Sequence, residues 1–99
     1  SVYKLDASEN QVWKFTADNR VFSVAVDSSG NVYVGTSSHS VYKLDASENQ
    51  VWKFTADSIV REVAVDSSGN VYAGTYGKYV YKLTPDGYNT TTYNWYKYP

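Results

Sequence analysis

The chain has 99 residues, with nine basic and ten acidic side chains, a formal net charge of −1 and no cysteine. This balance gives no positive field for nucleic acid or an anionic membrane, and the lack of thiols excludes disulfides and thiolate metal sites. No apolar run is long enough to span a bilayer and no leader is recognisable. We therefore expect neither a nucleic-acid partner nor a membrane partner, and the compartment is not indicated.

The first predicted strands belong to a segment that the chain repeats. Residues 1–18 read SVYKLDASENQVWKFTAD, and residues 40–57 read the same letters. Between residues 1–39 and 40–78, 31 of 39 positions are identical. A period of about 40 residues is typical of stacked supersecondary units. Copies so alike indicate a recent duplication or an engineered repeat.

Each repeat is predicted to form four short strands, because runs of Val, Tyr and Thr alternate with turn residues and no stretch has helical periodicity. Gly30 supplies the positive φ of the first turn, which Asp27 and Asn31 cap. The last turn is expected over residues 46–49. In this repeat the strands are predicted over residues 21–27, 31–36, 40–45 and 50–56.

The inner strands carry apolar residues on both faces, as in Val24-Ala25-Val26 and Val32-Tyr33-Val34. A sheet buried on both faces requires a neighbouring sheet on each side. Four-stranded antiparallel sheets packed face to face at this period are β-propeller blades, whereas the units of a solenoid, the competing repeat fold, are usually shorter or contain helices. We therefore predict an all-β propeller fold. Trp13 and Trp52 are predicted to pack between blades, with an aromatic ligand platform as the alternative.

The predicted strands make about two and a half blades. Residues 1–18 supply a half-blade with only the third and fourth strands, residues 19–57 a complete blade and residues 58–99 a second blade. This last blade diverges after Leu83. Its nearest tryptophan, Trp95, lies four residues beyond the position that matches Trp52. We therefore expect either about four inserted residues or a different path for the tail, which would form a fourth strand after a longer hairpin or an arm that reaches another chain.

An incomplete propeller exposes a sheet face at each end and one unpaired strand edge. Propellers close into rings of typically four to eight blades, and uncovered faces and edges drive association. We expect the chain to assemble with itself into a closed ring, or into a filament where the rotation does not close, unless it is a fragment of a longer propeller.

Differences between the repeats gather in the connections between the second and third strands and between the fourth and first strands, which open on one end of a propeller. Function usually lies on loops held by a rigid scaffold. Random sequence drift at positions that packing does not constrain gives the same pattern. The candidate binding face, for a protein or a glycan, consists of Arg20, Phe22, Ser37, Ser38, His39, Ile59, Arg61, Glu62, Tyr76, Gly77 and Lys78.

Residues with catalytic or metal-binding potential are sparse. His39 is the single histidine and has Lys78 in the equivalent position, so we interpret it as a surface residue. The loop at residues 27–31 carries oxygen-bearing side chains, but it lacks the alternating acidic positions and the closing Glu of a calcium loop. We predict no catalytic residue, no metal, no cofactor and hence no enzymatic activity.

Two segments, VYKLDASENQVWKF and VAVDSSGNVYVGT, resemble β-propeller repeats of the quinoprotein-dehydrogenase-like (PQQ-like) and NHL-like type. The Asp-Ala pairs that precede Trp13 and Trp52 are similar to the quinoprotein repeat. The resemblance implies the propeller fold. The quinone-dependent enzymes of that family need a calcium site, a catalytic Asp and often a vicinal disulfide, and we assign none of these roles to a residue of this chain.

The sequence thus favours a non-enzymatic propeller building block that assembles with itself. It would serve as a scaffold or as a binding module through the candidate binding face. Two alternatives stay open: a fragment of a quinone-dependent dehydrogenase-like propeller, and a glycan-binding (lectin) propeller.

Overall fold

The structure is a computed structural model that describes residues 1–77 and 79–94. No helix in this part of the chain has the length and apolar character that crossing a membrane requires. Its strands are β1 (Val2–Leu5), β2 (Gln11–Phe15), β3 (Val21–Val26), β4 (Val32–Thr36), β5 (Ser40–Leu44), β6 (Gln50–Thr55), β7 (Val60–Val65), β8 (Val71–Thr75), β9 (Tyr79–Leu83) and β10 (Asn89–Asn94).

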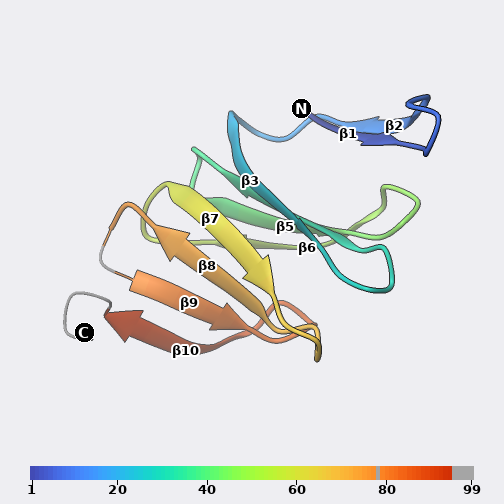
Figure 1. Cartoon of the computed structure of the whole chain (residues 1–99). Coiled ribbons are helices and arrows are strands. Elements are labelled where there is room, and N and C mark those ends of the chain that lie inside the picture. The colour runs from blue at the N-terminus through green and yellow to red at the C-terminus, as the bar shows by residue number, and fades with distance from the viewer. Residues whose placement is uncertain (78, 95–99) are drawn as a thin grey trace.

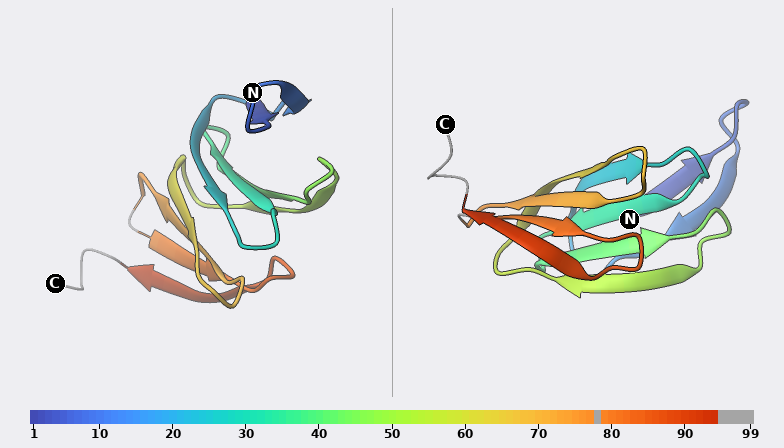
Figure 2. Two further views of the ribbon diagram at one scale, coloured as in Figure 1. Left: turned by 45° about the vertical axis from the view of Figure 1, so that its right-hand side comes forward. Right: turned by 90° about the horizontal axis from the view of Figure 1, so that it is seen from below.

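These strands form three antiparallel sheets that stack as layers (Figures 1 and 2). The half-blade is the two-stranded sheet β1-β2. The first blade has the strand order β3-β4-β5-β6, and the second blade has the order β10-β9-β8-β7. Strands that are consecutive in the chain pair within one sheet, except where the chain passes from one sheet to the next, after β2 and after β6. The all-β architecture and the total of about two and a half blades are as predicted.

The turn between the first two strands of a blade is built by an aspartate, a glycine and an asparagine. Asp27 Oδ1 accepts hydrogen bonds from the backbone N–H groups of Ser29 (2.9 Å) and Asn31 (3.0 Å). Gly30 has a φ of +85°, which a residue without a Cβ adopts at no steric cost. The second blade repeats this turn around Asp66. The predicted roles of these turn residues are therefore confirmed.

The carboxylate of this turn makes stability sensitive to acid. Burial alone raises the pKa of Asp27, but hydrogen bonds, chiefly from Asn31 and Tyr33, lower it from 3.8 to about 2. A folded pKa below the unfolded one adds stability that is complete above about pH 4 and is lost as the pH falls towards 2. We expect the free energy of unfolding to drop across this window, and less steeply in Asp27→Asn, in urea denaturation at several pH values.

The matched control is Asp86→Asn, a change at an exposed turn position. We expect it to follow the parent chain across the acid range. An acid profile for Asp27→Asn as steep as that of the parent would contradict the role given to Asp27.

The last strand has the same register as its counterpart in the first blade. β6 places Trp52 opposite Lys43 of β5, and β10 places Thr91 opposite Lys82 of β9. The loops at residues 45–49 and 84–88 have equal length. The prediction of about four inserted residues, which pairs Trp95 with Trp52, is therefore wrong. Thr91 takes the tryptophan position, and Trp95 lies outside the described residues.

Two apolar clusters fill the space between the layers. Because alternate residues of a strand face opposite sides of its sheet, the first blade contributes to both clusters. The cluster between the first and second blades contains Tyr33, Val41, Val60, Val63, Val71, Ala73 and Leu83. The cluster between the half-blade and the first blade contains Val2, Trp13, Val32, Val34, Tyr42 and Leu44.

A tryptophan on the fourth strand ties each layer to the next. Trp13 Nε1 donates to the backbone carbonyl of Ala46 (3.1 Å), and Trp52 Nε1 donates to that of Pro85 (2.9 Å). A lysine amine reaches each of the same two carbonyls. Both indoles therefore lie between blades, as their place in the repeat predicts.

Candidate functional site

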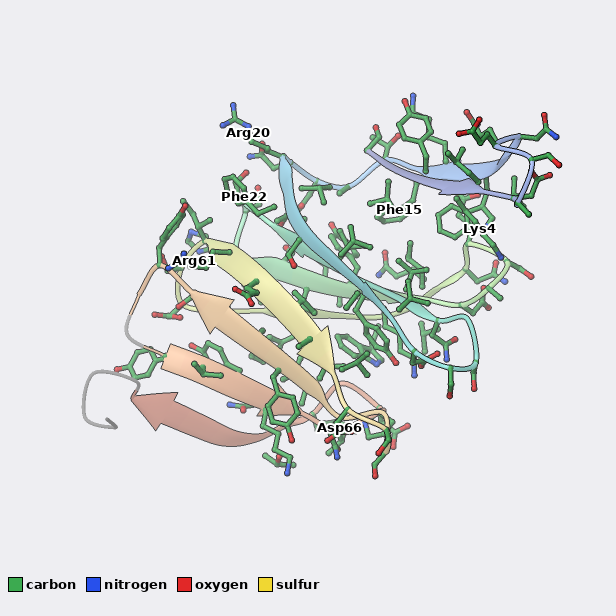
Figure 3. The ribbon with its side chains drawn as sticks, viewed as in Figure 1. Lys4, Phe15, Arg20, Phe22, Arg61 and Asp66 are labelled. Carbon is green, nitrogen blue, oxygen red and sulfur yellow. The ribbon has the colours of Figure 1, made fainter. Side chains whose placement is uncertain are left out.

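The candidate binding face lies at one end of the sheets. Figure 3 shows Phe22 and Arg61 at this end and Asp66 at the other. The backbone N–H of Ser37 donates to the carbonyl of Arg20 (2.9 Å), and the second blade has the equivalent bond. These bonds tie the connection between the second and third strands to the entry of the first strand. The two connections in which the repeats differ therefore meet at one end of each blade.

Three of the predicted residues meet in what we call the aromatic cluster: Phe22, Arg61 and Tyr76. The rings of Phe22 and Tyr76 lie edge to face with centroids 6.2 Å apart, and the guanidinium carbon of Arg61 is 5.3 Å from the Tyr76 centroid. Phe22 is 40% exposed and Tyr76 is 60% exposed. Phe22 and Arg61 lie at the β-bulges of β3 and β7, and bulges re-aim side chains. The first and second blades thus both contribute to one exposed cluster.

The remaining predicted residues are held in other ways. His39 has a φ of 70°, and its carbonyl accepts a hydrogen bond from the Ala56 N–H (2.7 Å). Gly77 lies against the carboxylate of Asp57. Ser37, Ser38 and Ile59 are partly buried, Arg20 and Glu62 are exposed, and Lys78 lies outside the described residues.

A hollow that the sequence pattern does not indicate lies on the outer face of the second blade. In the first blade the equivalent face is filled, because Val60 and Val63 pack so close that a Cβ on Gly35 would lie 2.7 Å from Val60 Cγ1. A Cβ on Gly74, one period later, would have no atom within 4 Å. We call this space the Gly74 hollow. It has a volume of about 420 Å³ and is lined by Arg61, Glu62, Ala64, Tyr72, Gly74, Thr75, Tyr79 and Val80.

A second hollow, of about 380 Å³, lies between the aspartate turns of the two blades. Its carboxylates are engaged in those turns: Asp27 accepts hydrogen bonds from the side chains of Asn31 (2.9 Å) and Tyr33 (2.8 Å). Asp66 likewise accepts one from the Tyr72 hydroxyl (3.1 Å). Among the described residues, no group of three or more His, Cys, Asp or Glu side chains is placed to hold a metal ion.

Residues 17–38 match a family model described as a two component regulator propeller. The matched segment runs from the end of the half-blade through the first two strands of the first blade. A comparison with curated proteins finds no significant match.

Several solved structures share the arrangement of these sheets. BamB from Moraxella catarrhalis matches with a TM-score of 0.78 and 20% identity, over 86% of this chain and 27% of that one. The Pan2 WD40 domain from Neurospora crassa matches with a TM-score of 0.70 and 14% identity, over 93% and 30%. Sqt1 from Saccharomyces cerevisiae matches with a TM-score of 0.69 and 15% identity, over 84% and 24%. The chain has the β-propeller fold and spans about a quarter to a third of the length of these proteins.

Proposed function

We propose that the chain is a non-enzymatic β-propeller building block that completes its stack of blades by assembling with copies of itself. The observation that supports this proposal is that none of the described residues covers either outer face of the stack. One outer face belongs to the half-blade and the first blade, and the other is the face of the second blade that contains the Gly74 hollow.

The first of these faces exposes apolar side chains whose equivalents are buried elsewhere in the chain. Val24 is 48% exposed, whereas Val63, one period later, is 5% exposed because it packs against the first blade. Tyr3 and Leu5 are also exposed, whereas their equivalents Tyr42 and Leu44 are buried. The same residue types in the same positions therefore differ only in whether a neighbouring sheet covers them. Exposed apolar surface of this kind favours association.

The half-blade also has a free edge. In the described strands β1 pairs with β2 alone, whereas β5, its equivalent, pairs with both β4 and β6. An unpaired edge presents backbone N–H and C=O groups that a strand of another chain can satisfy.

A dilution series in sedimentation velocity tests the proposal. We expect species of several chains at micromolar concentration that separate into single chains on dilution, with little response to salt because the uncovered faces are apolar. A single species of 11.1 kDa at every concentration would overturn it.

A second proposal concerns the aromatic cluster, which we propose as a glycan-binding surface. Two partly exposed rings and a guanidinium meet there. Aromatic and arginine side chains are the residue types that recognition surfaces favour. Their place at the loop end of a rigid scaffold supports a binding role.

Tyr76→Ala separates this binding role from a structural one. Because Tyr76 is exposed, we expect the free energy of unfolding to change by less than about 0.5 kcal/mol, while glycan binding on an array is lost. Tyr88→Ala is the control, because Tyr88 is 72% exposed in the turn between β9 and β10. A blank array for the parent chain, or binding that survives Tyr76→Ala, would refute the glycan site.

We also assign the repeats to the quinoprotein-like type, on the Asp-Ala pairs that precede Trp13 and Trp52. The contact between Trp13 and the carbonyl of Ala46 supports the assignment, because it gives this pair a part in joining successive blades. The assignment concerns the type of repeat and brings no quinone chemistry with it.

A further inference from the structure

We propose that two copies of the chain share one blade, in which the β7-β8 hairpin of one copy joins the half-blade of the next. We call this the joint blade. It rests on the proposed self-assembly and specifies the surfaces that carry it. In the joint blade, β8 of one copy pairs with the free edge of β1 of the next copy, and the β9-β10 hairpin gives up its place.

The contact between the first and second blades shows what fits the Gly74 hollow. In that contact, Val60 and Val63 of β7 pack beside Gly35 of β4. The equivalents of the two valines are Val21 and Val24 on β3, and the equivalent of the glycine is Gly74. Each chain therefore carries one further set of inserting valines and one further receiving face. They lie at opposite ends of its stack of sheets, so only a second copy can bring them together.

The half-blade leaves room for the β7-β8 hairpin of the other copy. It supplies only the third and fourth strands beside the first blade, so Val24 and Val26 of β3 stay exposed. The β7-β8 hairpin has the sequence of the missing strands, since residues 63–72 match residues 24–33 letter for letter. With the register of β4 on β5, it would set Ala73 opposite Tyr3 of the next copy.

The neighbour's half-blade also replaces the main contacts that β9-β10 gives up. Leu83 is buried against the first blade, and Tyr81 meets the ring of Phe54 with centroids 5.2 Å apart. Their equivalents in the half-blade are Leu5 and Tyr3, each 54% exposed in the single chain. The exchange therefore buries exposed apolar residues in positions that fit them.

Trp13 favours the half-blade over β9-β10 as the outer part of the joint blade. Trp13 is 8% exposed and bonded to the Ala46 carbonyl, whereas β10 has Thr91 in the tryptophan position. Docking of an intact second blade would displace Trp13 from this interface, while the joint blade keeps it. Each copy then adds two blades, so a closed ring of four to eight blades contains two, three or four copies.

Gly74→Ala tests the receiving face. In the single chain a Cβ at Gly74 meets no atom within 4 Å, so we expect the free energy of unfolding at high dilution to be unchanged or slightly higher. In the joint blade the same Cβ would collide with Val21 and Val24 of the next copy. We expect assembly to weaken about ten- to hundredfold in sedimentation velocity. Assembly as tight as that of the parent chain would overturn the joint blade.

Engineered cysteines test the strand pairing, in a chain that has no cysteine of its own. Opposed residues of antiparallel strands have Cα atoms about 4.5–5.5 Å apart, within the range of a disulfide. We expect Ala73→Cys chains mixed with Tyr3→Cys chains to form a disulfide-linked pair on mild oxidation. Val12→Cys is the control partner, because β2 lies one strand farther from β8.

The outcomes separate this inference from the function on which it rests. A parent chain that stays single at every concentration removes both. A parent chain that assembles, with no disulfide between positions 73 and 3 and no effect of Gly74→Ala, removes the joint blade and leaves self-assembly standing.

Discussion

Replacing Gly35 with alanine is expected to lower the free energy of unfolding by about 1–3 kcal/mol. The new Cβ would lie 2.7 Å from Val60 Cγ1 and 2.9 Å from Val63 Cγ2. Both neighbours are β-branched and stiff at χ1, so relief requires the second blade to move away from the first. Urea denaturation under single-chain conditions measures the loss.

The matched control is Gly74→Ala, the same substitution at the same position one period later. Its Cβ has open space in the single chain, and glycine within a strand costs conformational entropy. We therefore expect unchanged or slightly higher stability. Equal losses for the two variants would show that the substitutions act through the strand itself and not through contact between blades.

Trp13→Ala is expected to release the half-blade and leave the two complete blades folded. The change removes a buried indole and its hydrogen bond to the Ala46 carbonyl, at a cost of about 3–5 kcal/mol. An isolated two-stranded hairpin is marginally stable at best. We expect amide exchange in β1 and β2 to accelerate at least about a hundredfold, while protection in β3 to β9 stays close to that of the parent.

Val12→Ala is the control on the same hairpin, because Val12 is 52% exposed. We expect it to leave exchange in β1 and β2 nearly unchanged. Loss of protection spread evenly over the two complete blades in Trp13→Ala would contradict the picture of a separately held half-blade.

Most of the blade geometry follows from local sequence, which is why it could be predicted. The turn at residues 27–31 depends on one glycine and on side chains that bond within the turn. The strands between the turns follow from their Val, Tyr and Thr content. The repeat then indicates that sheets with the same pattern stack in the same way. Predicted strands of the first blade therefore agree with β3 to β6 to within a residue at either end.

Features that depend on spatial neighbours could not be predicted in the same way. The register of β10 is set by its pairing with β9 and by the length of the turn between them. Thr91 therefore occupies the position that Trp52 has in the first blade, although matching residue types would place Trp95 there. The contact between Phe22 and Tyr76 joins two blades, and its geometry depends on the relative orientation of those blades. The Gly74 hollow follows from the repeat only after the structure shows Val60 and Val63 filling the space beside Gly35.

The most direct test of the account is the native mass of the 99-residue chain at micromolar concentration. We expect discrete complexes of two, three or four chains for a closed ring, each a multiple of 11.1 kDa. A single stable species of one chain, with Val24 and the Gly74 hollow left open to solvent, would contradict the claim that these faces are made to be covered by another copy.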